Sequence, residues 1–168
     1  MKATLHTDGG ARGNPGPAAI GAVLRDGSNH VIGEISKVIG DTTNNIAEYT
    51  AVIEGLKLAH ELGVTDIEVQ MDSKLVVMQL SGEWKIKSDG LRGLAVEARR
   101  LLNRFSSAKL THVGREANAD ADKLVNQALD ASSDRLDDRA GQQDLEPLWE
   151  PDEDDDRPRP GPGQTSLL

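Results

Sequence analysis

The sequence contains no cysteine among its 168 residues. It can therefore form neither a disulfide framework nor a thiolate metal site, and a reducing compartment such as the cytoplasm suits it. It also lacks any run of 18 or more apolar residues, and no basic patch followed by an apolar stretch opens the chain. We therefore expect a cytoplasmic monomer with no disulfide partner, no membrane span and no secretion signal.

The formal net charge of −9 argues at first against a nucleic-acid partner, since phosphates repel acidic proteins. The distribution of the charge reverses this inference. Residues 1–131 carry 15 Lys+Arg against 17 Asp+Glu, whereas residues 132–168 carry 4 against 11. The second segment includes "EPLWEPDEDDDRPRPGPGQ", which has little to bury. We predict a nearly neutral folded domain over 1–131 and an acidic, Pro/Gly-rich disordered tail or linker over 132–168.

Hydrophobic periodicity along residues 1–131 changes several times between the strand pattern and the helix pattern. It predicts strands over 2–8, 18–26, 30–40, 66–72 and 108–114, and helices over 42–63, 73–82, 90–105 and 118–132. The order βββαβααβα predicts an α/β fold with a mixed five-stranded sheet flanked by helices. In such a sheet the first and fourth strands can lie parallel and adjacent, and both end in an aspartate, Asp8 and Asp72.

Four carboxylates stand out in this arrangement. Asp8 and Asp72 fall where ligands gather in open α/β sheets, at the carboxyl ends of strands. Glu48 lies in the first predicted helix and Asp122 in the last. Each has an ordinary explanation when taken alone: a strand-ending turn for Asp8, which "GGARGNPG" follows, a helix N-cap for Asp72, and solvated helix acids for Glu48 and Asp122.

Taken together, four segments resemble the type 1 ribonuclease H family, in order and at suitable spacing: "TDGGARGNPGPAAIGAVL", "TTNNIAEYTAVIEGL", "VQMDSKLVVMQLSGEWKIKS" and "VGREANADADKLVNQALD". The resemblance covers about residues 2–131 and implies the same mixed five-stranded sheet. It also implies an endoribonuclease that hydrolyses the RNA strand of RNA–DNA hybrids, leaving 5′-phosphate and 3′-hydroxyl ends. A catalytically silent hybrid-binding module and the nuclease half of a larger bifunctional protein remain as alternatives.

The resemblance implies that Asp8, Glu48, Asp72 and Asp122 are the catalytic carboxylates. Crowded carboxylates repel one another, so the site requires cations. Oxygen ligands without His or Cys indicate two Mg²⁺ or Mn²⁺ ions. Asp120 is a rival to Asp122 because "NADAD" offers both, but the family pattern Asn, two residues, then Ala-Asp-x-Leu matches Asn118 and Asp122. We interpret Asp120 as an acid favoured by the helix dipole.

Substrate contacts are also implied by the resemblance. A glycine backbone can approach the minor groove of a hybrid and meet ribose 2′-hydroxyls. "GEWKIKS" would face the DNA strand, with Trp84 stacking or, equally, closing a small core, and with lysines meeting phosphates or simply solvated. The predicted substrate-binding residues are Gly9, Gly10, Asn14, Thr43, Asn44, Asn45, Ser73, Trp84, Lys85, Lys87, Arg115 and Asn118.

Two departures from the family pattern are visible. Between Asp72 and Thr111 there is room for two helices and little else, which predicts the short bacterial or archaeal-like form without the basic protrusion. The loop before Asp122 also lacks the histidine that many members carry there. Arg115 occupies this loop instead, and it can act electrostatically but not as a general base at neutral pH. We expect His112, in the fifth strand, to be a packing residue.

Overall fold

The computed structural model describes residues 1–137, so the predicted tail from residue 138 onward lies outside the described residues. Between residues 1 and 137 the chain follows the predicted order of elements, with one added 3-10 turn, η1. The elements are β1 (Lys2–Ala11), β2 (Gly16–Asp26), β3 (Val31–Thr42), α1 (Asn44–Glu61), β4 (Asp66–Met71), α2 (Lys74–Leu80), α3 (Asp89–Leu102), β5 (Ser107–His112), η1 (Arg115–Asn118) and α4 (Ala119–Asp137).

The strands form one mixed sheet in the order β3-β2-β1-β4-β5. β1 pairs antiparallel with β2 and β2 with β3, whereas β1 and β4 run parallel, as do β4 and β5. The β1–β4 ladder ends at the pair Thr7 and Met71. The predicted fold class and the predicted parallel neighbours are therefore confirmed, and Asp8 and Asp72 each lie one residue past the last pair.

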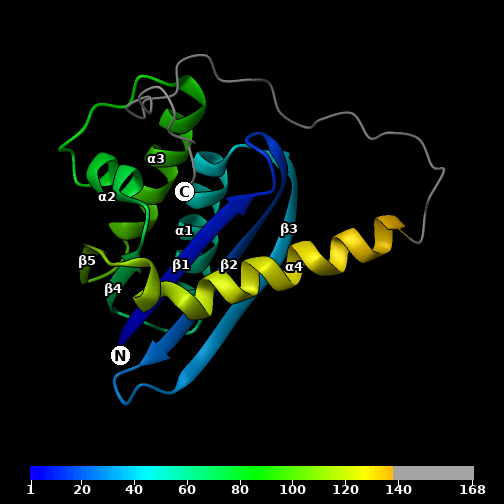
Figure 1. Cartoon of the computed structure of the whole chain (residues 1–168). Coiled ribbons are helices and arrows are strands. Elements are labelled where there is room, and N and C mark those ends of the chain that lie inside the picture. The colour runs from blue at the N-terminus through cyan, green and yellow to red at the C-terminus, as the bar shows by residue number, and fades with distance from the viewer. Residues whose placement is uncertain (138–168) are drawn as a thin grey trace.

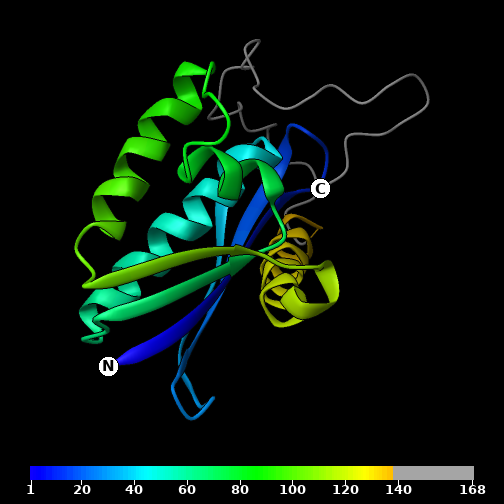
Figure 2. The ribbon, with the colours of Figure 1, turned by 90° about the vertical axis from the view of Figure 1, so that its left-hand side faces the viewer.

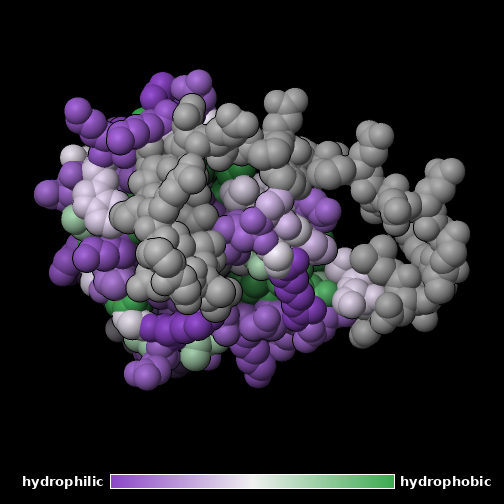
Figure 3. Space-filling view, turned by 45° about the horizontal axis from the view of Figure 1, so that its top comes forward, coloured by the Kyte–Doolittle hydropathy of each residue, from purple (hydrophilic) through white to green (hydrophobic). Residues whose placement is uncertain are grey.

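Helices cover the two faces of the sheet unequally. Figures 1 and 2 show α1, α2 and α3 on one face and α4 crossing the other. The main core lies under α1–α3 and includes the fully buried Leu5, Tyr49, Leu56 and Met71. A smaller cluster under α4 contains Ala19, Val125, Ala128 and Leu129. Figure 3 shows a mainly hydrophilic surface with small hydrophobic areas among the described residues.

β1 is longer than the sequence pattern predicts. The prediction of a strand ending in a turn at Asp8-Gly9 is wrong, because β1 continues through both glycines to Ala11 and pairs with β2 as far as Ala18. Gly9 allows this because β1 passes against α1: a Cβ on Gly9 would lie 2.3 Å from the carbonyl carbon and oxygen of Ala47. Asp8 therefore lies within a strand that pairs with β2 on one side as far as Ala11 and with β4 on the other as far as Thr7.

Other element ends differ by smaller amounts. α4 continues to Asp137, past the end that its hydrophobic pattern predicts at residue 132. Between β4 and β5 the chain forms α2 and α3 and no further helix, as the prediction of a short form without the protrusion requires. Across residues 1–137 we find no helix with the length and apolar content needed to span a membrane.

Candidate active site

Three acidic side chains from three elements converge at the end of the sheet toward which β1 and β4 run. Asp8 comes from β1, Asp72 follows β4, and Glu48 lies near the start of α1. One carboxylate oxygen from each lies within 4.8 Å of the others. The strand register and the position of α1 are thus sufficient to bring together three residues that are 64 positions apart at most in the sequence.

The start of α1 is anchored to the end of β1. Thr43 is the N-cap, and its hydroxyl accepts a hydrogen bond from the amide of Ile46 at 3.3 Å. The side-chain oxygen of Asn44 accepts a hydrogen bond from the backbone amide of Ala11 at 2.8 Å. The backbone amide of Asn44 in turn donates to the side-chain oxygen of Asn14 at 3.0 Å. These bonds set the distance between α1 and β1, and they therefore set the position of Glu48 relative to Asp8.

Asp8 and Glu48 are acids in surroundings that disfavour negative charge. Asp8 is 6% exposed and Glu48 is 1% exposed. Burial, followed by repulsion from Asp72 and the presence of Asp122, raises the pKa of Asp8 to about 8. Burial, then repulsion from Asp8 and Asp72, raises the pKa of Glu48 well above its usual range. Negative charge on these carboxylates is therefore unfavourable unless protons or cations neutralise it.

Asp72 is less enclosed than its two neighbours. Burial raises its pKa, and Asp122 adds to this effect, whereas Arg115 and His112 oppose it. Arg115 is exposed and lines the same cleft, and its electrostatic role there stays a prediction. The expectation that His112 packs in the interior is wrong: it is exposed at the end of β5, in register with Met71 and so beside Asp72.

Asp122 and Asp120 occupy different sides of α4. Asp122 lines a cleft of about 200 Å³ together with Asp8 and Asp72. Asp120 points elsewhere and pairs with Arg25 of β2. The structure thus places Asp122 with the other acids, although it stands outside the group of three whose oxygens lie within 4.8 Å.

Most of the predicted contacts on the glycine side of the site lie at the cleft or beside it. Gly9, Gly10 and Asn44 line the cleft, although Gly9 and Asn44 are otherwise buried, and the exposed Asn14 accepts a hydrogen bond from the Asn44 backbone amide. Asn45 is buried. Thr43 and Ser73 are helix N-caps, and Ser73 accepts a hydrogen bond from the amide of Val76. Gly9, which we expected to approach a substrate, is also required for packing, because β1 passes too close to Ala47 of α1 for a Cβ at this position.

Asn118 and the "GEWKIKS" segment add further detail. Asn118 is 1% exposed, and its side chain donates to the carbonyl of Thr7 at 2.8 Å. It therefore fastens η1 to β1 behind the acids. Trp84 is half-buried against the main core, while Lys85 and Lys87 are exposed.

Two residues of the site escaped sequence reasoning. Arg12 lines the cleft and pairs with Asp130 of α4, so it bridges the turn after β1 to the last helix. His112 approaches Asp72 because β5 lies next to β4. The signal for His112 was its place at the end of the fifth strand, where the register brings it beside the end of the fourth.

The acids fit a hard divalent cation. Their oxygens are close enough to share an ion, and Oε2 of Glu48 is buried without a hydrogen-bond partner. A buried carboxylate oxygen without a donor is costly unless a cation or a proton meets it. Carboxylate oxygens are also the ligands that Mg²⁺ and Mn²⁺ prefer.

Together, this mixed sheet and the acids at the ends of β1 and β4 define an α/β domain of the ribonuclease H type. Residues 6–128 match a family model described as reverse transcriptase-like. The Ribonuclease HI of Halobacterium salinarum is 48% identical over 74% of this chain and 63% of its own length. The Ribonuclease H of Hydrogenovibrio crunogenus is 38% identical over 75% and 94% of the two chains. The chain belongs to the ribonuclease H family, in its type 1 form.

A protein of Mycobacterium tuberculosis that is named as bifunctional is 46% identical to this chain over 134 residues. The match covers 79% of this chain but only 37% of the length of that relative. Two solved structures are also similar. RNase H1 from Halobacterium salinarum gives a TM-score of 0.77 at 45% identity, covering 78% of this chain and 99% of that one. LC11-RNase H1 in complex with an RNA/DNA hybrid gives 0.74 at 40% identity, covering 78% and 99%.

Proposed function

We propose that this protein is an endoribonuclease that hydrolyses the RNA strand of RNA–DNA hybrids and leaves 5′-phosphate and 3′-hydroxyl ends. The observation that carries the proposal is the convergence of Asp8, Glu48 and Asp72 within 4.8 Å, with Asp122 on the same cleft. The names of its relatives support the reaction class. The hybrid in the LC11-RNase H1 complex supports the substrate class.

In this proposal Asp8, Glu48, Asp72 and Asp122 would together hold two Mg²⁺ or Mn²⁺ ions. Such ions supply an activated water at neutral pH and stabilise the charge on the leaving oxygen of a phosphodiester. The protein's own contribution is rigidity. Asp8 is fixed within β1, and Glu48 is fixed by the bonds that join α1 to β1.

The remaining residues bind and orient the hybrid. Gly10 and Asn44 line the cleft beside the acids, and in the proposal they face the RNA strand, whose 2′-hydroxyls distinguish it from DNA. Arg115 lies in the cleft as well and offers a permanent positive charge to a phosphate. The exposed Lys85 and Lys87 bind the phosphates of the DNA strand in this proposal.

The substrate class is tested by cleavage of RNA–DNA, RNA–RNA and DNA–DNA duplexes of one sequence, with Mg²⁺, with Mn²⁺ and with a chelator. We expect cleavage of the RNA strand in the hybrid, only with a divalent ion, and end-labelling should show 5′-phosphate products. Equal cleavage of the DNA duplex, or cleavage in the chelator, would contradict the proposal.

Asp72→Asn provides the matched inactive protein. We expect hybrid cleavage to fall by at least about 10³-fold, since one charged ligand is lost. The protein should remain folded and bind hybrid, and its melting temperature should hold or rise because repulsion among the acids decreases. Turnover close to that of the unsubstituted protein would remove Asp72 from the mechanism.

A further inference from the structure

The segment between α2 and α3 presents its side chains alternately inward and outward. Trp84 and Ile86 are half-buried against the main core, and Ser88 is fully buried. Lys85 and Lys87 are exposed between them. Because the segment is not helical, this alternation directs both lysines away from the core. Figures 1 and 2 show the α2–α3 connection at the end of the sheet toward which β1 and β4 run.

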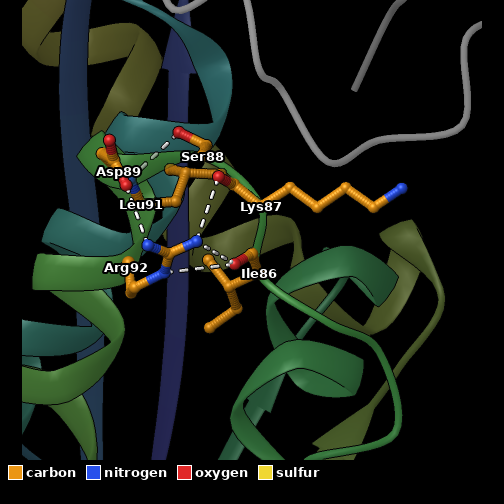
Figure 4. A network of polar contacts seen from close by, with 6 residues as sticks. All are labelled: Ile86, Lys87, Ser88, Asp89, Leu91 and Arg92. Atoms are coloured by element: carbon orange, nitrogen blue, oxygen red, sulfur yellow. Dashed lines mark hydrogen bonds and ion pairs between the residues drawn. The ribbon is translucent and has the colours of Figure 1, made fainter.

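Arg92, in the first turn of α3, holds the backbone of this segment. Its Nη2 donates to the carbonyl of Ile86 at 3.0 Å and to that of Lys87 at 3.2 Å, and its Nε donates to Ile86 at 3.3 Å. Its Nη1 donates to Asp89 at 2.8 Å. Figure 4 shows the guanidinium facing these carbonyls, while the Lys87 side chain extends away from the network.

The last residue of this segment, Ser88, is also held in place, because it caps the start of α3. The Ser88 hydroxyl accepts from the amide of Leu91 at 3.3 Å and caps the helix. Arg92 therefore joins a capped helix end to the two residues that precede the cap. A guanidinium suits this task because its donors lie in one rigid plane, whereas a lysine ammonium is a single flexible point charge.

We propose that Arg92 is a positioning residue for nucleic-acid binding: it fixes the 85–87 backbone so that Lys85 and Lys87 meet the phosphates of the DNA strand as a preformed pair. This inference rests on the proposed function. The donors of Arg92 point toward protein carbonyls and Asp89, so its effect on the substrate is transmitted by the lysines. Preformed binding groups lose less conformational entropy when the ligand arrives.

The test measures the affinity of a fluorescent RNA–DNA hybrid in chelator, where no cleavage occurs, for Arg92→Ala, Arg92→Lys and the control Arg100→Ala. Arg100 is an exposed arginine on the same helix, so its removal reports the effect of net charge alone. We expect Arg92→Ala and Arg92→Lys each to weaken binding about 3- to 10-fold more than Arg100→Ala does. With a divalent ion, KM should rise while kcat stays unchanged.

A double-mutant cycle completes the test. In a Lys85→Ala/Lys87→Ala background, Arg92→Ala should weaken binding no more than Arg100→Ala does, because there is no longer a lysine pair to position. Full affinity in Arg92→Lys would show that Arg92 acts through its charge, and additive losses would show that it acts independently of the lysines. Either result overturns the inference. Failure of the unsubstituted protein to bind or cleave hybrid when a divalent ion is present would instead overturn the proposed function.

Discussion

Glu48 and Leu56 lie on the same helix and are both inaccessible, Glu48 at 1% and Leu56 at 0% exposure. A leucine gains free energy from such a position, whereas a carboxylate loses its hydration. The Gly9 amide compensates in part by donating to Glu48, but Oε2 has no donor. A buried acid with one carboxylate oxygen left unsatisfied is an expected sign of function.

The choice between Asp122 and Asp120 can be settled by a pair of alanine substitutions. The two positions are separated by about 200° around a helix. Asp122 lines the cleft with Asp8, and Asp120 pairs with Arg25 at the surface. We expect Asp122→Ala to reduce turnover severely and to raise the concentration of divalent ion needed for half-maximal rate, whereas Asp120→Ala should do little. The reverse result would remove Asp122 from the site.

The acids also predict how stability depends on pH when divalent ions are removed. The pKa of Asp8 is raised to about 8 from an ordinary value of 3.8, so between these values the folded state binds more protons than the unfolded state. The free energy of unfolding should therefore fall as the pH rises across this window, by up to about 1.4 kcal/mol per pH unit for one proton.

Thermal melts in chelator between about pH 5 and about pH 8 measure this effect. Asp8→Asn should flatten the profile, and Asp120→Asn serves as the control because its carboxylate is outside the cluster. Adding Mg²⁺ or Mn²⁺ near pH 8 should recover the lost melting temperature, because cations then replace protons. A melting temperature that rises with pH throughout this range would contradict the prediction.

At the scale of elements, the sequence predicts the order of strands and helices and the parallel contact of β1 and β4, because hydrophobic periodicity and connection rules determine both. It does not predict that β1 runs through Gly9 and Gly10. Locally those residues indicate a turn. In the structure both pair with β2, and position 9 has no room for a side chain because Ala47, 38 positions further along the chain, lies against it. The same limit applies to His112 and Asn118, whose surroundings depend on neighbouring strands.

Gly9→Ala tests whether this contact sets the position of α1. The added Cβ would lie 2.3 Å from backbone atoms of Ala47, so α1 must move and carry Glu48 with it. We expect a loss of at least about 1–3 kcal/mol in the free energy of unfolding and a large loss of activity. Gly93→Ala is the matched control: nothing lies within 4 Å of its Cβ position, and alanine in a helix should stabilise by up to about 1 kcal/mol.

For the whole molecule, charge is divided along the chain. Residues 1–131 are close to neutral, whereas residues 132–168 carry 4 basic against 11 acidic residues. A polyanionic substrate therefore meets a domain that barely repels it and a segment that repels it strongly. The cations of Lys85, Lys87 and Arg115 are exposed on the domain, so the acidic segment opposes the very interaction that they favour.

Removal of residues 138–168 should therefore leave folding intact and make hybrid binding faster. Ending the chain at Asp137 keeps the whole of α4, including the Val125 and Leu129 contacts of its buried cluster. We expect an unchanged melting temperature and a value of kcat/KM at least as high as that of the full chain. The gain should be largest at low ionic strength and should shrink as salt screens the charges.

A chain of equal length with the acids of residues 138–168 changed to Asn and Gln controls for size and should match the shortened chain. If the shortened chain melted at a lower temperature, residues such as Leu145, Leu148 or Trp149 would have to stabilise the domain, and the assignment of this segment as a dispensable acidic tail would be wrong.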